Sequence, residues 1–380
     1  MLYPIYYRGD GFSGKLIVVV GMQFGSEGKG AITSHLAPTI DMGVRSGSAN
    51  AGHTIYFQNK KFVMRQIPTA WINPKAKLVI GAGALVSSDV LLKEIEYISR
   101  FSKIKHRLFI DYRAHVITPE QIRQEQQTDL GTRIGSTSAL SCEGIGAAAA
   151  DKVLRKSSCL RAKDFPELKP YLTDTVDLIN TSLDDGGRVI LEGTQGLGLS
   201  LDYGYFPFVT SRDTSAGSLA ASVGVSIHQF DAEIIGVVRT YPIRVAGNSG
   251  PFGKDAQEIS WEDVARNAGT SRKIKEKTSV THKVRRVSTF SKSEFVKACR
   301  INRPTCLALT FADYLDWSVH ERKEISDPVK SFIEMIEDLS EISVCLIKTG
   351  PKAIIDLERE KVNQFYKSLA DRWRQNLAAS

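Results

Sequence analysis

The sequence lacks long apolar runs and has few cysteines. None of its apolar runs approaches the roughly 20 residues that span a bilayer. The opening letters, MLYPIYYRGDGFSGK, lack the apolar core of a secretory signal peptide. The five cysteines are odd in number and without metal-ligand spacing, which disfavours a disulfide framework and a zinc site. We therefore expect a protein of the reducing cytoplasm, with no membrane association.

Acidic residues are fewer than basic ones, 42 against 50, which gives a formal net charge of +8. This charge suits anionic partners, but it does not distinguish nucleic acid from small phosphorylated substrates. Apart from residues 272–286, the basic residues are spread along the chain rather than clustered on one stretch. We therefore expect no direct binding to nucleic acid.

Short β-branched runs alternate with longer stretches of helical periodicity. Several runs are apolar at nearly every position, as in strands of a sheet that is covered on both faces. The expected strands are residues 16–20, 77–80, 107–110, 188–192, 233–238, 306–310 and 344–349. Apolar residues at three- and four-residue spacing predict helices over residues 87–101, 328–341 and 356–375. This alternation predicts an α/β fold around a mostly parallel central sheet.

The chain shows no repeat and no low-complexity linker, so we expect residues 1–380 to form one large domain. Two polar stretches, residues 131–150 and 265–289, are predicted to be long loops inside that domain. Long loops on such a scaffold are often functional, and we expect these two to belong to the active site.

The stretch VVVGMQFGSEGKG, Val18–Gly30, has the form of a phosphate-binding loop between a strand and a helix. The backbone N–H groups at a helix N-terminus favour an anion there. A Walker A loop would need a serine or threonine after the lysine, yet Gly30 follows Lys29, and Gln23 occupies the place of its first glycine. The alternatives are a P-loop-like phosphate site and a tight strand-to-helix turn.

A histidine, His53, lies in the small-residue stretch SGSANAGHTIYF between two expected strands. A lone histidine is often a structural residue, but in a glycine-lined turn it is less crowded. Imidazole is the usual proton donor to phosphate oxygens near neutral pH, so His53 is a candidate catalytic residue.

Several motifs together resemble one family, the adenylosuccinate synthetases. GSEGKG (25–30) stands for the family's GDEGKG, and NAGHT (50–54) is identical. EGTQG (192–196) stands for EGAQG, and FPFVTSRDTSAG (206–217) for YPYVTSSNTTAG. The matches follow the family's order and extend over about residues 16 to 351.

The resemblance implies a two-step ligation by a homodimeric, Mg²⁺-dependent enzyme. The purine 6-oxygen attacks the γ-phosphate of a nucleoside triphosphate, and the aspartate amine then displaces phosphate from C6. Removing the N1 proton makes the oxygen a nucleophile, and phosphorylating it makes it a leaving group.

The resemblance also assigns roles residue by residue. His53 stabilises the transferred phosphate, and the Gly52 carbonyl helps to hold Mg²⁺. The implied contacts to phosphates and to the triphosphate come from Gly25, Glu27, Gly28, Lys29, Gly30, Gly52 and Thr54. The implied contacts to the purine nucleotide come from Asn50, Ser136, Thr137, Gln195 and Thr210, and from Arg155, which the family sends across its dimer interface. The alternatives are a polar loop residue for Gln195 and a solvated surface charge for Arg155.

The main departure from the family is Ser26, which stands where GDEGKG has its aspartate. The family acid removes the N1 proton and ligates Mg²⁺, but a serine hydroxyl is no carboxylate base and is a weaker magnesium ligand. One interpretation is an inactive paralogue. The other is a change of substrate, because a small neutral side chain leaves room for the 2-amino group of guanine and can accept its hydrogen bond. We keep Ser26 as a candidate catalytic, purine-binding and metal-binding residue.

The same substitution resembles a viral branch of the family, from viruses that replace adenine by 2,6-diaminopurine. Those enzymes join L-aspartate to dGMP and give N6-succino-2-amino-2′-deoxyadenylate. The resemblance implies this carbon–nitrogen ligase activity, with the aspartate carboxylate or a magnesium-bound water as the alternatives for the missing base. An ordinary synthetase acting on IMP with GTP is the main alternative, and a P-loop-type NTPase is a weaker one because of Gly30.

The basic stretch THKVRR (281–286) resembles the loop that binds aspartate in the family. Two cationic side chains facing two carboxylates are a sound recognition pair. Thr281, Lys283 and Arg285 are the candidate aspartate contacts, and an exposed basic turn is the alternative.

The implied phosphate-donor site combines Asp313 with the late turn that contains Gly350 and Pro351. Asp313 can accept from guanine N1–H and N2–H₂ or from the adenine 6-amino group. Phe311 replaces the family's lysine over the base and offers stacking without purine preference. The viral branch indicates ATP or dATP as donor, and GTP stays possible.

Overall fold

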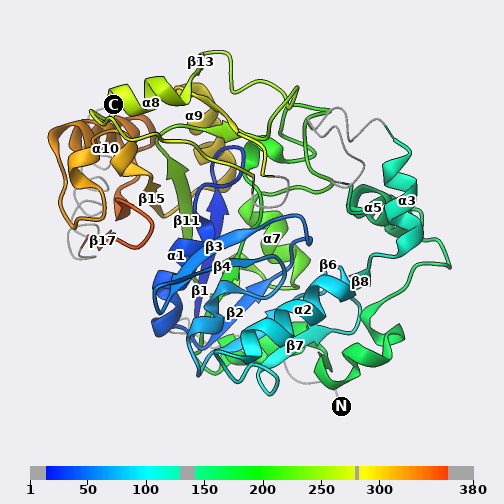
Figure 1. Ribbon diagram of the computed structural model, residues 1–380. Helices are drawn as coiled ribbons and strands as arrows, with labels where there is room; N and C mark the ends of the chain where they lie inside the picture. The colour runs from blue at the N-terminus through cyan, green and yellow to red at the C-terminus, as the bar shows by residue number, and fades with distance from the viewer. Residues whose placement is uncertain (1–13, 129–141, 279–281, 358–380) are drawn as a thin grey trace, which may run out of the picture.

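The computed structural model describes residues 14–128, 142–278 and 282–357. Its centre is a ten-stranded sheet, drawn in Figure 1, whose strands are parallel except for the edge strand β17, which runs antiparallel to β16. In order across the sheet, the strands are β17 (Ile354–Asp356), β16 (Val344–Lys348), β15 (Cys306–Thr310), β11 (Asp231–Arg239), β1 (Lys15–Gly21), β10 (Arg188–Glu192), β2 (Met42–Arg45), β5 (Lys77–Ile80), β7 (Leu108–Asp111) and β9 (Leu172–Thr173).

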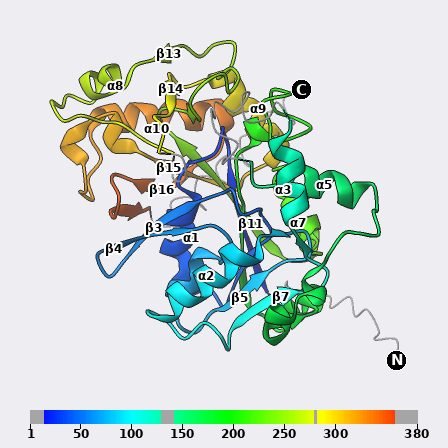
Figure 2. The ribbon, with the colours of Figure 1, turned by 45° about the vertical axis from the view of Figure 1, so that its right-hand side comes forward.

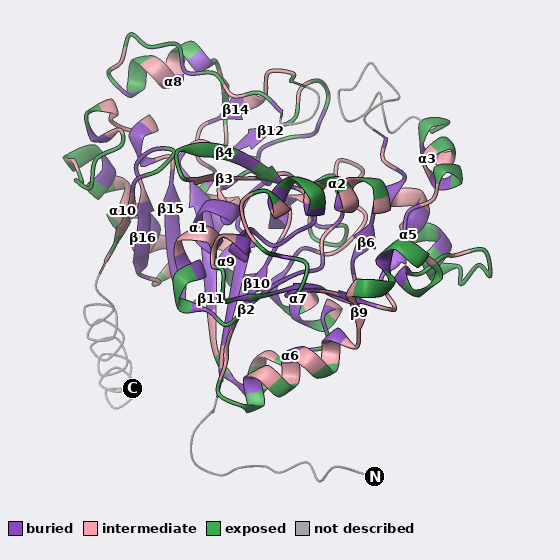
Figure 3. Ribbon diagram, turned by 60° about the horizontal axis from the view of Figure 1, so that its bottom comes forward, coloured by how far each residue is buried: buried purple, intermediate pink, exposed green. Residues whose placement is uncertain are grey.

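Both faces of this sheet are buried, which explains the unbroken apolar runs of its strands. Successive side chains of a strand point to opposite faces. In β1, Ile17 and Val19 therefore join one apolar cluster, while Leu16, Val18 and Val20 join another on the opposite face. Figure 3 shows the central strands as buried and places most exposed residues on the surrounding elements.

Helices and a hairpin cover the two faces. One face packs against α1 (Lys29–Leu36), α2 (Ser88–Ser99), the hairpin of β3 (His53–Phe57) and β4 (Lys60–Met64), and the 3₁₀ helix η2 (Thr69–Ile72) (Figure 2). The other face packs against α6 (Thr175–Asp184), α7 (Ala216–Ser222), α9 (Lys292–Asn302) and α10 (Asp327–Ser340).

Smaller units extend from this core. A three-stranded antiparallel sheet packs against α8 around the buried Trp261 and Val264. Its elements are β12 (Ile243–Arg244), β14 (Arg286–Ser288), β13 (Glu258–Ile259) and α8 (Trp261–Asn267). Beside the opposite end of the main sheet lie α3 (Pro119–Gln126), α5 (Ile145–Val153) and the paired strands β6 (Leu85–Val86) and β8 (His115–Val116).

Short 3₁₀ helices complete the path. They are η1 (Ala37–Thr39), η4 (Ala162–Asp164), η5 (Pro166–Tyr171), η6 (Leu197–Leu199), η7 (Ile227–Gln229), η8 (Ala312–Tyr314) and η9 (Trp317–Val319). Within the described ranges, no helix is both long and apolar enough to cross a bilayer.

All seven strands expected from the sequence are confirmed, as are the α/β fold and the helices α2 and α10. The helix predicted over 356–375 begins on a residue that ends β17, and positions 358–375 lie outside the described residues.

The loop predictions were partly wrong. Residues 145–150 belong to α5, because an alanine-rich segment with good helix propensity follows the glycines. Residues 265–289 include the end of α8 and the strand β14, and are otherwise mostly irregular in their described part. The single-domain extent of 1–380 stays a prediction.

The close packing of β2 against η2 gives a stability prediction. A Cβ at Gly43 would lie 2.5 Å from the Cβ of Ala70. We expect Gly43→Ala to lower the free energy of unfolding by about 1–3 kcal/mol, measured by urea denaturation, because the sheet and η2 must move apart. In the matched control Gly217→Ala, the new Cβ meets nothing within 4 Å on α7, so stability should stay equal or rise. Equal losses in both variants would contradict this packing argument.

Candidate active site

A cavity of about 1430 Å³ opens at the carboxyl ends of the central strands. In open α/β sheets, ligands bind at this edge because the loops after the strands converge there. The volume exceeds the range of about 300–1,000 Å³ typical of a single small-molecule site. Loops that follow β1, β2, β10, β15 and β16 all contribute to its lining.

Residues predicted from the sequence make up about a third of this lining. They are Gly25, Ser26, Gly28, Lys29, Gly30, Asn50, Gly52, His53, Thr54, Gln195, Thr210, Lys283, Arg285, Asp313, Gly350 and Pro351. Glu27 and Arg155 do not line the cavity. Ser136, Thr137 and Thr281 lie outside the described residues.

The glycine loop, residues 22–28, is organised around the buried carboxylate of Glu27. Its Oε1 accepts hydrogen bonds from the backbone N–H groups of Gln23 (3.2 Å) and Gly25 (2.7 Å). Its Oε2 forms an ion pair with the ammonium of Lys29 at the start of α1. The carboxylate therefore faces the loop's own donors and supports the loop from inside. The phosphate contact expected of Glu27 stays a prediction.

Ser26 lies exposed at the crest of the glycine loop and faces the cavity. Its φ angle of 55° is in the left-handed region, which aspartate and asparagine adopt more readily than serine. The loop backbone is thus compatible with the family's aspartate at this position. Arg239 holds the crest by donating from Nη1 to the Ser26 carbonyl, 3.1 Å away.

His53 opens β3, and its position depends on Glu192 at the end of β10. The Nδ1 of His53 is hydrogen-bonded to Glu192 Oε1. Glu192 is fully buried and its Oε2 also accepts from the N–H (2.7 Å) and hydroxyl (3.0 Å) of Thr69. Arg45, at the end of β2, lies 3.5 Å from the Oε1. The strands β2, β3 and β10 and the helix η2 thus each place a residue at this carboxylate.

Burial and the nearby Arg45 guanidinium lower the pKa of His53 to about 4, against the opposing attraction of Glu192. Burial alone would raise the pKa of Glu192, but His53 and Arg45 hold that pKa below its ordinary value. The imidazole is therefore neutral and the carboxylate ionised near neutral pH. Because Nδ1–H donates to Glu192, Nε2 carries the lone pair, and a phosphate anion close to it would favour the protonated ring.

The sequence motifs contained Glu192 without giving it a role, and they missed Arg239 altogether. Arg239 ends β11 and is fully buried. It donates to the Tyr241 carbonyl (2.6 Å), pairs with Glu276 and lies 4.0 Å from the ring centre of Phe311. The available signal was a charged residue at the end of a buried strand, where functional side chains of parallel sheets collect.

At the other end of the cavity, Asp313 follows β15 and is buried. Its Oδ2 accepts from Nδ1 of His320 at 2.7 Å, and the His320 ring stacks on Trp317 at 4.1 Å. Burial raises the pKa of Asp313, although His320 and Lys348 oppose the shift. Burial also lowers the pKa of Lys348 to about 8.

Only some of the described basic side chains in the stretch 281–286 line the cavity. Lys283 and Arg285 line it, and burial lowers the pKa of Arg285. Arg286 instead pairs with Glu258 at 2.6 Å. Arg155 is exposed in the turn after α5, so its predicted contact with a partner subunit's nucleotide stays a prediction.

The residues present fit a magnesium ion that is held chiefly by substrate phosphates. Among the described residues, no group of three or more His, Cys, Asp or Glu side chains is arranged for a metal. Mg²⁺ in phosphoryl-transfer sites commonly keeps waters and binds one or two protein oxygens plus phosphates. The Ser26 hydroxyl and the Gly52 carbonyl, both at the cavity, could supply such neutral oxygens.

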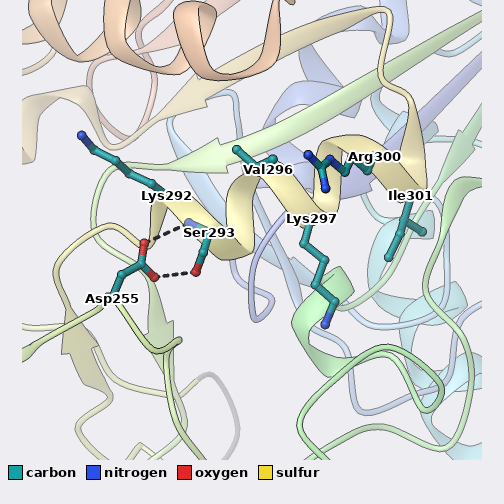
Figure 4. Close-up of a pocket in the computed structure, with 7 residues that line it drawn as sticks. All are labelled: Asp255, Lys292, Ser293, Val296, Lys297, Arg300 and Ile301. Atoms are coloured by element: carbon teal, nitrogen blue, oxygen red, sulfur yellow. Dashed lines mark hydrogen bonds between the residues drawn. The ribbon is translucent and has the colours of Figure 1, made fainter.

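A second cavity of about 610 Å³ lies along α9, and no residue of the glycine loop lines it. In Figure 4, Asp255 points at the N-terminal end of this helix. It accepts from the Ser293 N–H (2.9 Å) and hydroxyl (2.7 Å), and from the Ser291 hydroxyl. These donors outweigh burial and lower the pKa of Asp255 to about 2, as expected for a residue that fixes a helix end.

The low pKa of His53 predicts an acid-sensitive stability in the ligand-free protein. Between pH 6.5 and about 4, the unfolded chain binds a proton at His53 that the folded chain does not. Stability should therefore fall across this window, by up to about 3 kcal/mol from this residue. His53→Asn keeps a donor for Glu192 but does not titrate, so its unfolding free energy should fall less than that of wild type. Parallel pH dependences of the two proteins in urea denaturation would contradict the assignment.

Comparisons with known proteins identify the family of this chain. A family model described as adenylosuccinate synthetase matches residues 18–165 and 162–321. Adenylosuccinate synthetases from Thermococcus sibiricus and Methanocaldococcus jannaschii are 40% and 41% identical to this chain, over 91% and 90% of it and 99% and 97% of those proteins.

Two solved structures share the fold. The cyanophage S-2L succinoaminodeoxyadenylate synthetase, bound to dGMP and dATP as an energy donor, has a TM-score of 0.76 and 26% identity. That match covers 93% of this chain and 99% of the cyanophage protein. A fully ligated adenylosuccinate synthetase from Plasmodium falciparum has a TM-score of 0.77 and 22% identity, over 91% and 100% of the two chains. This chain therefore belongs to the adenylosuccinate synthetase family and is a carbon–nitrogen ligase.

Proposed function

We propose that this enzyme joins L-aspartate to C6 of dGMP and gives N6-succino-2-amino-2′-deoxyadenylate, the precursor of a diaminopurine nucleotide. The observation that carries the proposal is the position of Ser26. This residue stands at the crest of the glycine loop, facing the cavity, where the family has an aspartate. Lys29 and His53, which match the family's motifs, also line the cavity.

Replacing a carboxylate by a hydroxyl changes what can lie beside the purine ring. IMP has only hydrogen at C2, whereas dGMP has an amino group there. A serine is shorter than an aspartate and carries no charge, and its oxygen can accept a hydrogen bond from that amine. The glycine loop would thereby hold dGMP with its N1–C2 edge toward Ser26.

The proposed reaction has two balanced steps. The purine O6 attacks the γ-phosphorus of the triphosphate, the bond to the β-phosphate oxygen breaks, and the N1 proton leaves. The aspartate amine then attacks C6, the C6–O6 bond breaks, inorganic phosphate leaves, and the amine loses a proton. When bound, Mg²⁺ would neutralise charge on the triphosphate oxygens.

The residues of this chain would bind and orient the reactants. Lys29 and the N–H groups at the start of α1 face the phosphates, where the helix dipole favours an anion. His53, held by Glu192, places Nε2 toward the transferred phosphoryl group. Lys283 and Arg285 would hold the carboxylates of the aspartate. The N1 proton would go to that substrate's own carboxylate or to a water.

We infer ATP or dATP as the donor, with its base between Phe311 and Asp313. The cyanophage structure, which is bound to dGMP and dATP, supports both this donor and the dGMP acceptor. We also propose a homodimer in which Arg155 reaches the partner's nucleotide phosphate, and a location in the cytoplasm.

The second candidate is an ordinary adenylosuccinate synthetase that uses IMP and GTP. The relatives at 40% and 41% identity carry that name, and this observation favours it. Parallel incubations with dGMP, GMP and IMP, each with aspartate, Mg²⁺ and ATP or GTP, separate the two by mass spectrometry of the products. Consumption of IMP without dGMP would overturn the proposal.

The Ser26→Asp variant tests the physical reason directly. We expect it to lose dGMP turnover by at least about tenfold, because the carboxylate crowds the 2-amino group, and to gain turnover of IMP. The backbone angle at this position accommodates aspartate, so a loss is not attributable to loop strain.

Ser26→Gly is the matched control for this test, because glycine also adopts the left-handed φ and removes the whole hydroxymethyl side chain, which leaves more space without adding a charge. It should keep a preference for dGMP over IMP if space is the deciding factor. Unchanged dGMP kinetics in Ser26→Asp would show that residue 26 does not face the C2 edge.

The Glu192→Gln variant tests whether Glu192 positions His53 for catalysis or only stabilises the fold. In this variant the amide oxygen stays with Thr69, and the amide N–H₂ turns to His53 Nδ1. The protonated ring that a phosphate favours then has no carboxylate to compensate its charge. We expect kcat to fall about 10²–10⁴-fold, in line with the loss of an orienting carboxylate elsewhere, and KM to change little. Glu337→Gln is the control, because Glu337 caps the N–H of Val344 away from the cavity. Equal effects of both variants on kcat would contradict this role.

A further inference from the structure

The end of the cavity that is proposed to bind the phosphate donor contains the carboxylate of Asp313. One of its oxygens accepts a hydrogen bond from the described part of the protein and the other does not. Asp313 Oδ2 accepts a hydrogen bond from His320 Nδ1 at 2.7 Å. Its Oδ1 is buried and has no hydrogen-bond partner among the described residues. Asp313 is 3% exposed, and a buried acceptor without a partner is costly, so a ligand group is the natural donor to Oδ1.

The histidine that occupies Oδ2 is fixed in place. Its ring stacks on Trp317 with the centres 4.1 Å apart and the planes 10° from parallel. His320 and Trp317 both line the cavity together with Phe311, so the pair lies where the donor base is proposed to bind. A stacked ring with its nitrogen on a carboxylate cannot turn away without losing both contacts.

We propose that His320 determines the purine preference of the phosphate donor by occupying one of the two oxygens of Asp313. This inference rests on the proposed function, because it takes Asp313 as the residue that reads the donor base. It goes beyond that function by assigning the choice between adenine and guanine to a residue outside the motifs.

The reason is the number of hydrogen bonds each base offers. Guanine presents N1–H and N2–H₂ side by side, and this edge is bound best by both oxygens of a carboxylate. Adenine needs only one acceptor, for its 6-amino group. His320 takes one lone pair of Oδ2, so a guanine bound across both oxygens must share Oδ2 with the imidazole and its second hydrogen bond is weakened. Adenine, bound at Oδ1 alone, loses none. A bidentate contact to a base typically discriminates about tenfold or more.

Inosine triphosphate isolates the second hydrogen bond, because it is GTP without the 2-amino group. In the wild-type enzyme we expect ATP to be the best donor and GTP and inosine triphosphate to have similar kcat/KM. A wild-type GTP-to-inosine-triphosphate ratio of about ten or more would overturn the proposal without any variant.

Two substitutions test the residue itself. In His320→Ala both oxygens of Asp313 are available, so the GTP-to-inosine-triphosphate ratio of kcat/KM should rise about tenfold, and GTP should gain on ATP. In His320→Asn, the amide nitrogen takes the place of Nδ1 and still donates to Oδ2, so the wild-type ratios should return. An unchanged ratio in His320→Ala, or equal changes in both variants, would contradict the proposal.

His35→Ala is the matched control, since His35 also lies near an aspartate, Asp356 at 3.5 Å, but does not line the cavity. Every assay uses the purine monophosphate that the wild-type enzyme consumes fastest. If that acceptor proves to be IMP, the proposed function fails, yet the donor ratios still test His320. If dGMP is consumed and the ratios do not respond, only the role of His320 fails.

Discussion

The arrangement of this site depends on one buried carboxylate, that of Glu192. It ends the central strand β10 and connects by hydrogen bonds to His53 on β3 and Thr69 on η2, with Arg45 of β2 beside it. A buried charge persists only when such partners compensate its desolvation. The interaction therefore does two things at once. It fixes the hairpin against the sheet edge, and it sets the tautomer of the histidine that faces the cavity.

A second buried charge, Arg239, connects the two ends of the cavity. It contacts the carbonyl of Ser26 in the glycine loop, the side chain of Glu276 in the basic region and the ring of Phe311. The side chain of Arg239 thereby connects the segment 270–278 to the crest of the glycine loop. Rigid support of this kind is what phosphoryl transfer needs, because positioning supplies most of its catalysis.

The sequence predicted the sheet well because its strands are buried on both faces and read as continuous apolar runs. Most of the predicted site residues that the structure describes do line the cavity, because they follow strand ends in recognisable motifs. Glu192 and Arg239 were missed as site residues because their roles come from contacts between strands far apart in the chain. The inward orientation of Glu27 was equally invisible, since a motif states which residue is present but not which way its side chain points.

Under the proposed assignments, both ends of the cavity select a purine through a change at a carboxylate. At the acceptor end, Ser26 removes a carboxylate that would face the C2 edge of the purine. At the donor end, Asp313 keeps its carboxylate, but His320 occupies half of it. Each change alters which purine edge can be hydrogen-bonded while Lys29 and His53 stay as they are. At the donor end, selectivity for the base therefore lies on residues separate from Lys29 and His53, whereas at the acceptor end residue 26 serves both selectivity and chemistry. One scaffold can change its nucleotides at such positions while it retains its fold.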